Sequence, residues 1–143
     1  MPASRDYDLR AGSSSPLELA LKRNVQAPAV ARAAISGLCD DLALGGTIRQ
    51  TIVLLVSEVV SNAVLHSSGP ADAEITVTAK VTPEAVRVAV TDAGDGFTPV
   101  ARDPRRVDGG YGLFLLEKSA SSWGVEPTSP TTVWFEMARG PGA

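Results

Sequence analysis

Glu58 and Asn62 place two polar side chains in an otherwise apolar segment, SEVVSNAVLH, at residues 57–66. A spacing of four residues puts both on one helix face, from which both could reach one ligand. A carboxylate can accept a proton or orient a hydroxyl group, and a carboxamide oxygen is a neutral ligand suited to Mg²⁺. The same spacing also fits the ordinary polar face of an amphipathic helix. His66 continues this face, and we expect it to make a polar contact at the helix end rather than to act in catalysis.

A glycine-rich stretch, DAGDGF at residues 92–97, follows a strand-like run. Asp92 would lie at the strand end, where a carboxylate can accept a hydrogen bond from an exocyclic amine such as that of adenine. Gly94 and Gly96 lack the Cβ that would keep backbone and ligand apart. A tight turn would use the same residue types, so this stretch alone leaves both interpretations open.

A second glycine-rich stretch, DGGYGL at residues 108–113, precedes an apolar run with helical spacing. Gly109, Gly110 and Gly112 would open a helix whose unpaired N–H groups lie at the positive end of its dipole. Such a helix start is a site for phosphate oxygens. A flexible linker before a helix would have the same composition.

Several kinds of site are excluded by what the sequence lacks. It has no Gly-x-x-x-x-Gly-Lys-Ser/Thr, His-Glu-x-x-His or Gly-x-Ser-x-Gly motif, and its one histidine has no recognisable nucleophile turn to serve. The formal charge of −3 favours neither nucleic acid nor an anionic membrane as a partner. The single cysteine, Cys39, forms no intrachain disulfide, and with no signal-like or long apolar run we expect a cytoplasmic protein.

Strands are predicted by alternating apolar and polar residues. The first strand would bury Leu17, Leu19 and Leu21, and the second and third would form an antiparallel hairpin through the turn TPEA. In the last strand, Val133, Phe135 and Met137 alternate with Thr132, Trp134 and Glu136. The expected strands are 17–24, 75–81, 86–90, 123–127 and 131–137.

Helices are predicted where apolar residues recur at steps of three and four. The first would span 27–44 and end at Gly45 and Gly46, and the second would start at an N-cap, Thr47, and end before Ser68, Gly69 and Pro70. A third would begin at residue 111. The apolar face of the first helix would comprise Val30, Ala33, Ala34, Leu38 and Leu42, and that of the second Ile52, Leu55, Val56, Val59, Ala63 and Val64.

This order of elements predicts an α+β fold, a two-layer sandwich with a mixed, mostly antiparallel sheet and its helices on one face. We expect one domain at residues 16–138. Residues 1–15 and 139–143, which are polar or rich in Gly and Pro, would be mobile tails.

Taken in order, Glu-x-x-x-Asn on a helix, a strand followed by Asp-x-Gly-x-Gly-Phe, and Gly-x-Gly-Leu opening a helix resemble the GHKL or Bergerat-fold ATP-binding superfamily. Gyrase, histidine kinases and mismatch-repair ATPases belong to it. The segments LLVSEVVSNAVLHS, VTDAGDGF, GGYGLFLLEKSASSWGV and TTVWFEM are similar to its small branch of anti-sigma-factor serine/threonine kinases. The resemblance runs from Pro16 to Ala138.

By that resemblance, Glu58 is the general base that polarises the attacking hydroxyl group, and Asn62 holds the Mg²⁺ that bridges the ATP phosphates. Asp92 binds the adenine amino group, partly through a water shared with a threonine of the last hairpin, which we assign to Thr132.

The glycines would shape the rest of the ATP pocket. Gly94 and Gly96 would line the adenine, and Gly110, Gly112 and Leu113 would pass the phosphates over the helix N-terminus. Residues 97–109 would form a lid. Three lid arginines are candidate contacts to phosphate or to a partner, although a solvated charged loop would look the same: Arg102, Arg105 and Arg106.

Three departures from the branch's pattern stand out. Tyr111 lies between two glycines, at a position where an arginine is frequent in this branch. Any contact that this arginine makes with the lid has no counterpart in this chain. The sequence SPT at 129–131 replaces a glycine-containing turn, which bears on the assignment of Thr132. The lid is short and contains proline.

The resemblance implies an ATP- and Mg²⁺-dependent protein kinase that phosphorylates a small antagonist protein, sequesters a sigma factor, or both, and it implies a homodimer. We would place the dimer contact on the apolar faces of the first helix and first strand. A nucleotide-binding interaction module with negligible phosphoryl transfer would share every ATP-site residue. A detached histidine-kinase catalytic domain would have to act in trans on a phosphoacceptor helix elsewhere.

Overall fold

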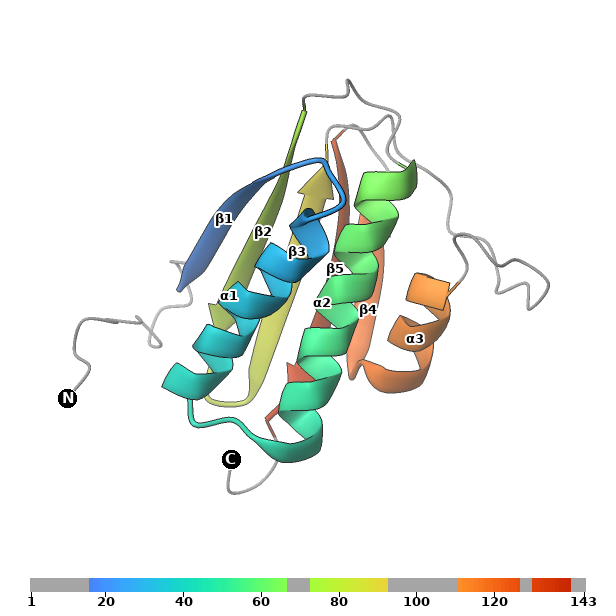
Figure 1. Ribbon diagram of the computed structural model, residues 1–143. Helices are drawn as coiled ribbons and strands as arrows, with labels where there is room; N and C mark the ends of the chain where they lie inside the picture. Colours follow the sequence, from blue (N-terminus) through green and yellow to red (C-terminus); the bar gives the residue numbers. More distant parts are fainter. Residues whose placement is uncertain (1–15, 67–72, 93–110, 127–129, 140–143) are drawn as a thin grey trace.

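The sheet has five strands, and the computed structural model describes residues 16–66, 73–92, 111–126 and 130–139. Its strand order is β1-β2-β3-β5-β4, with every neighbouring pair antiparallel (Figure 1). The sheet is therefore antiparallel throughout rather than mixed. All five expected strands are present, with ends that differ by one or two residues. They are β1 (Leu17–Lys22), β2 (Glu74–Val81), β3 (Ala85–Asp92), β4 (Ser122–Glu126) and β5 (Thr131–Ala138).

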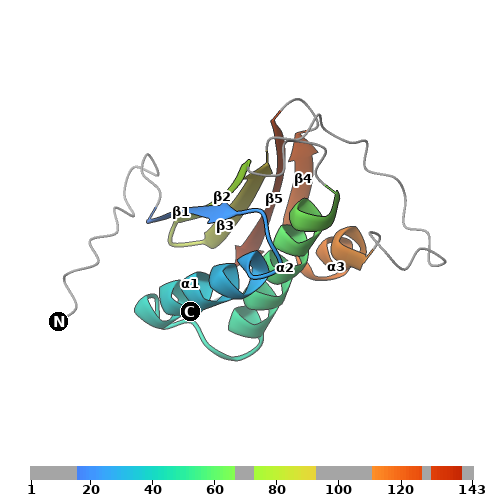
Figure 2. The same ribbon diagram turned by 45° about the horizontal axis from the view of Figure 1, so that its top comes forward.

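Within the described residues, three helices form the second layer, on one face of the sheet (Figure 2). α1 lies nearest β1, α2 crosses above β3 and β5, and α3 stands beside β4 (Figure 1). The expected α+β two-layer architecture is confirmed. The helices are α1 (Ala27–Asp41), α2 (Gly46–His66) and α3 (Tyr111–Ser119).

The buried face of α1 differs from the predicted one. Leu38 is buried as expected, but Val30 is 46% exposed and Ala33 is exposed. The stripe that packs on the sheet follows steps of four and three residues from the first helical residue, at i, i+4, i+8, i+11 and i+12. Leu42 also packs against the core. Apolarity alone therefore predicted the buried face only in part, because alanines occur all around this helix. The buried residues are Ala27, Ala31, Ile35, Leu38 and Cys39.

The C-terminus of α1 is closed by Ala43 rather than by the glycines at 45 and 46. Ala43 has a φ of 57°, a left-handed conformation that is unfavourable for a residue with a Cβ. Its N–H donates to the carbonyl of Asp40 (3.1 Å), and the N–H of Leu44 donates to the carbonyl of Cys39 (2.9 Å). This is the bonding pattern of a Schellman motif, and the buried Leu44 supplies its usual apolar contact.

We expect Ala43→Gly to raise the free energy of unfolding by about 0.5–1 kcal/mol, because glycine adopts the left-handed conformation without a Cβ clash. Denaturant unfolding measures the change. Ala33→Gly is the matched control: on an exposed, ordinary helical position the same substitution should destabilise by about 0.5–1 kcal/mol. If the two substitutions change stability with the same sign, the strain at Ala43 is not real.

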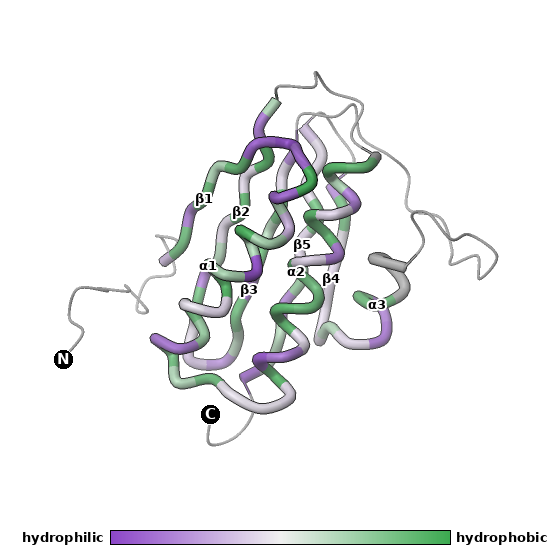
Figure 3. Tube along the Cα trace, viewed as in Figure 1, coloured by the Kyte–Doolittle hydropathy of each residue, from purple (hydrophilic) through white to green (hydrophobic). Residues whose placement is uncertain are grey.

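α2 is the central helix of the second layer. It begins at Gly46, one residue before the predicted N-cap, and the expected stop at 68–70 lies outside the described residues. The predicted buried face is confirmed for Ile52, Leu55, Val56, Val59 and Ala63, with Val64 partly buried. Apolar residues recur along its whole length (Figure 3).

Among the described residues, α2 is also the one helix long and apolar enough to cross a membrane, with a hydropathy of 1.4 over Gly46–Leu65. Its buried residues pack on the sheet, which is the position of a core helix in a two-layer domain. The composition therefore reflects packing inside this fold.

Cys39 lies in the core between the two long helices and is 1% exposed. Burial raises the pKa of its thiol, an effect that exceeds the opposing influence of Arg49. Arg49 in turn binds Asp40 and Ser36 on α1, and so joins the end of α1 to the start of α2.

We expect the Cys39 thiol to react with a thiol reagent only after unfolding, because it is buried and stays protonated. A group whose folded-state pKa is raised stabilises the fold below its unfolded pKa and loses that contribution as the pH rises through the folded value. Stability should therefore fall at pH values above the ordinary thiol pKa, and the fall should be smaller in Cys39→Ala. Equal reactivity of folded and urea-unfolded protein would contradict this placement.

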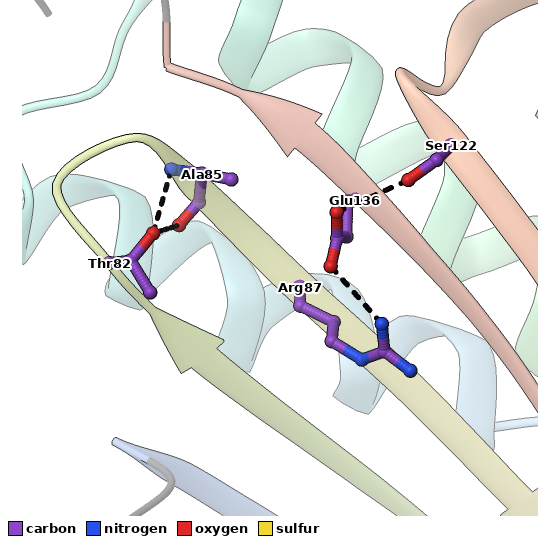
Figure 4. A network of polar contacts seen from close by, with 5 residues as sticks. All are labelled: Thr82, Ala85, Arg87, Ser122 and Glu136. Carbon is purple, nitrogen blue, oxygen red and sulfur yellow. Dashed lines mark hydrogen bonds and ion pairs between the residues drawn. The ribbon is translucent and has the colours of Figure 1, made fainter. Parts of the chain in front are cut away.

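The β2–β3 hairpin is closed by Thr82, whose hydroxyl accepts a hydrogen bond from the N–H of Ala85 (3.1 Å; Figure 4). Arg139, which we expected in the C-terminal tail, instead extends β5 onto this turn. Its N–H donates to the carbonyl of Glu84 (2.8 Å) and its guanidinium to the carbonyl of Thr82 (3.0 Å). The other residues of the two expected tails lie outside the described residues.

The sheet face opposite the helices carries a polar cluster across β3, β5 and β4 (Figure 4). Arg87 donates to Glu136 (3.1 Å), which also accepts a hydrogen bond from Ser122 (3.2 Å). The guanidinium lies 4.0 Å from the ring centroid of Trp134, a cation–π contact. A Cβ at Gly124 would lie 2.8 Å from this indole, so the absence of a side chain there lets the ring lie flat on β4.

Candidate functional site

Asp92 is the last residue of β3 and is directly opposite Thr131, the first residue of β5. Both belong to the helix-covered face of the sheet. In β3, Val86, Val88 and Val90 are buried at alternate positions before Asp92. In β5, Phe135 and Met137 are buried at alternate positions after Thr131. Thr131 is 2% exposed, and its hydroxyl has no hydrogen-bond partner among the described residues. A buried polar group without a partner is costly, so this hydroxyl is a place where a ligand or bound water would be satisfied.

Thr132, the threonine that we assigned to the adenine site, lies on the other face of the sheet. It is opposite Thr91, and the two hydroxyl oxygens are 2.9 Å apart, within hydrogen-bond distance. The structure does not bring it to the side of Asp92. Thr131 was missed although a signal was present: it has the parity of Val133, Phe135 and Met137, the predicted buried face.

Glu58 and Asn62 lie on the flank of α2 that faces away from α1. The opposite flank is marked by Ser57, which accepts a hydrogen bond from Arg32 of α1 (2.7 Å). Successive residues turn by about 100° around a helix, so the directions of both side chains can be counted from Ser57. Asn62 points toward α3, and Glu58 points between α3 and solvent. Both side chains are partly buried, and neither has a hydrogen-bond partner within the part of the chain that the structure describes.

Three elements direct these residues to one end of the sandwich. α2 and β3 both finish there, at His66 and Asp92, and the N-terminal end of α3 points the same way (Figure 1). The carboxamide of Asn62 is one turn from the end of α2. The end of α2, the end of β3 and the start of α3 therefore lie toward one end of the sandwich, and the region above the sheet at this end is the candidate site.

The first turn of α3 contains Gly112 and Leu113, as predicted, and has no acidic residue. No carboxylate in this turn therefore neutralises its N–H groups or the positive end of the helix dipole. The helix start favours the binding of an anion. The remaining predicted pocket and lid residues lie outside the described residues: Gly94, Gly96, Arg102, Arg105, Arg106 and Gly110. His66 closes α2, and its side chain is likewise outside the description.

The donor set suits a nucleotide with its own metal ion better than a resident metal. Among the described residues, no three His, Cys, Asp or Glu side chains gather as ligands. One carboxamide would leave most of the coordination sphere to phosphate oxygens and water, which is how Mg²⁺ is usually held at nucleotide sites. The hydroxyl of Thr131, which has no partner among the described residues, lies opposite Asp92, and a polar nucleobase would suit this pair.

Comparison with known proteins agrees with this arrangement. The family profile of the histidine kinase-like ATPase domain matches residues 21–136. The chain belongs to this family. The expected GHKL superfamily is thereby confirmed. The match runs from the end of β1 to the end of β5 and includes Glu58, Asn62, Asp92 and Thr131.

Solved structures share the fold of this family. The RsbU and RsbW domains of Rv1364c from Mycobacterium tuberculosis align with a TM-score of 0.68 at 22% identity, over 85% of this chain and 31% of that one. The histidine kinase domain of a blue-light activated kinase from Erythrobacter litoralis aligns at 0.52 and 21%, over 77% and 60%. The chain thus spans less than two thirds of each. Among curated protein sequences, none matches significantly.

We expect Thr131→Val to raise the free energy of unfolding of the nucleotide-free protein by about 1 kcal/mol, because it removes a buried hydroxyl without a partner and keeps the side-chain shape. The same substitution should weaken adenine-nucleotide binding about tenfold. Denaturant unfolding and calorimetric titration measure the two effects.

Thr132→Val is the matched control. It removes the hydrogen bond to Thr91 on the open face, so it should lower stability slightly and leave nucleotide affinity unchanged. The assignment fails if Thr132→Val, and not Thr131→Val, weakens binding.

Proposed function

We propose that the protein binds ATP with Mg²⁺ and transfers the γ-phosphoryl group to a serine or threonine of a partner protein. The observation that carries this proposal is the placement of Glu58 and Asn62 together on the α2 flank that faces the region above Asp92. A base and a metal-binding carboxamide one turn apart serve a phosphoryl transfer, which needs positioning and charge neutralisation more than covalent chemistry.

In the proposed site, Asp92 accepts a hydrogen bond from the adenine amino group, and the hydroxyl of Thr131 binds the same base directly or through water. The first turn of α3, with Gly112 and Leu113, receives the phosphates together with Gly110. Gly94 and Gly96 are proposed to line the adenine. When bound, Mg²⁺ neutralises phosphate charge, and Asn62 is the side chain proposed to hold it.

Transfer requires a base at the attacking hydroxyl group. The oxygen of this hydroxyl group bonds to the γ-phosphorus, while the bond from that phosphorus to the bridging oxygen of ADP breaks. The hydroxyl proton passes to the carboxylate of Glu58. Because Glu58 is partly buried and free of hydrogen bonds within the described part of the chain, its oxygens are available to a donor from the partner.

For the partner, the similarity in fold to a chain with an RsbW domain and the four motif segments support the anti-sigma-factor branch. We propose a small antagonist protein as the phosphoryl acceptor, a sigma factor as a sequestered partner, and a role in transcription regulation in the cytoplasm. The rival function, a nucleotide-binding interaction module with negligible transfer, uses the same pocket and differs only in turnover.

Glu58→Gln tests the transfer step. The variant keeps the size of the side chain but cannot take the proton, so transfer from labelled ATP to a small antagonist protein offered as acceptor should fall at least about a hundredfold. Its affinity for ATP should stay within about twofold of the wild type, since adenine and phosphates are held elsewhere.

Glu74→Gln, an exposed carboxylate of β2, is the control and should transfer at the wild-type rate. Undiminished transfer by Glu58→Gln would remove Glu58 from its assigned role. If the wild type binds ATP but labels no serine or threonine, the interaction module is the correct function.

A further inference from the structure

The face of α2 that points away from the sheet carries two exposed leucines that the core does not use. Leu54 is 45% exposed and Leu65 is 67% exposed. Their separation in sequence corresponds to about three full turns, which leaves the two side chains about 20° apart around the helix axis. Both therefore lie on one line along α2, on the side opposite the buried residues Val56 and Ala63.

Glu58 lies on this line between the two leucines. Along the axis it is about 6 Å from Leu54 and about 10 Å from Leu65. Around the axis it is displaced from each of them by at most about 40°, toward the side on which Asn62 points. The carboxylate that we assign as the base is thus flanked by an exposed apolar side chain in both directions. Leu54, Glu58 and Leu65 together are called the outer stripe of α2.

Apart from Glu58, this face of α2 carries no charged residue. The one other charged residue of the helix, Arg49, is bound to Asp40 and Ser36 of α1. The solvent-facing side of an amphipathic helix normally carries charged residues, whereas the centre of a protein interface is depleted of them. The composition of this face is therefore that of a binding surface. The residues beside the outer stripe are Thr47, Gln50, Thr51 and Ser61.

We propose that the outer stripe binds the acceptor segment of the partner protein, and that this segment carries apolar side chains on both sides of its reacting serine or threonine. The inference rests on the proposed function, because transfer requires a hydroxyl group of the partner at Glu58. A segment that brings its hydroxyl group there and runs along α2 covers Leu54 on one side and Leu65 on the other.

The surface of the stripe determines which side chains suit these two places. An apolar side chain over either leucine removes apolar surface of both molecules from water. A charged side chain at the same place would lose water without gaining an oppositely charged partner on α2. An extended chain advances about 3.3 Å per residue, so the apolar residues are expected about two positions from the reacting residue on one side and about three on the other.

A peptide library with a fixed central serine or threonine and random flanking residues tests the proposal. The full chain is incubated with the library, labelled ATP and Mg²⁺, and the labelled peptides are sequenced. With the wild type, apolar residues should be enriched about fivefold or more on each side of the central residue, because each contact covers an exposed leucine.

Leu54→Lys and Leu65→Lys should each change the preference on one side only. An ammonium group in place of the apolar surface should select acidic residues there, and the two variants should act on opposite sides, because the leucines lie on opposite sides of Glu58. Val30→Lys, at a residue of α1 with a similar exposure of 46%, is the control and should keep both apolar preferences. Thermal unfolding verifies that each variant is folded.

The outcomes separate this inference from the proposed function. Labelled peptides without an apolar preference, or lysine variants that change the same side or neither side, would overturn the inference and leave phosphoryl transfer standing. Another segment of this chain or a second copy would then cover the outer stripe. Labelling of a small antagonist protein but of no library peptide would also overturn it, since recognition would not lie in the segment around the reacting residue. No labelling of either acceptor would remove the proposed function and this inference with it.

Discussion

The register of β3 against β5 is the constraint on which the rest of the site depends. Because side chains alternate between faces, a slip of one residue would exchange the buried and exposed sets of both strands. The observed register places Asp92 opposite Thr131 on the helix-covered face and pairs Thr91 with Thr132 on the open face. One arrangement of hydrogen bonds thus buries Val88 and Phe135 in the core and also composes the polar end of the proposed nucleotide site.

α2 likewise contributes residues to both the core and the proposed site. Its core stripe is complete without Glu58 and Asn62, so both polar side chains can occupy a flank at little cost to packing. Thr131 shows the opposite balance, since its hydroxyl is buried without a partner. Groups held in unfavourable surroundings are common where a ligand later satisfies them. The buried hydroxyl of Thr131 therefore lowers the stability of the nucleotide-free domain at the end where we propose that adenine binds.

Much of the fold could be predicted from the sequence, because its strands are β-branched and strictly alternating. The Val, Ile and Leu positions of β1, β2 and β3 show which face is buried, and the stripe of α2 is equally clear. The face of α1 was predicted only in part, because apolarity cannot rank Ala27 and Ala31 above Val30. The end of α1 was also misplaced, since two glycines are a stronger signal for a helix end than Ala43, which adopts the left-handed conformation beside the buried Leu44.

The site was predicted in part. Spacing on one helix is a local property, so the shared flank of Glu58 and Asn62 followed from the sequence. The alternation with Val133, Phe135 and Met137 placed Thr131 on the buried face, but that it lies opposite Asp92 depended on the register between β3 and β5. The motifs were enough to identify the superfamily. To tell which side chain faces the proposed ligand, the register of the sheet was needed.

The central claim is that Asn62, Asp92 and Thr131 belong to one ATP site, and thermal unfolding in the presence of an ATP analogue with Mg²⁺ tests it most directly. A ligand that binds only the native state raises the unfolding temperature in a saturable way. The wild type should show such a rise, Asp92→Asn should lose most of it, and omission of Mg²⁺ should reduce it in the wild type but not in Asn62→Ala. No rise for the wild type at millimolar nucleotide would contradict the account.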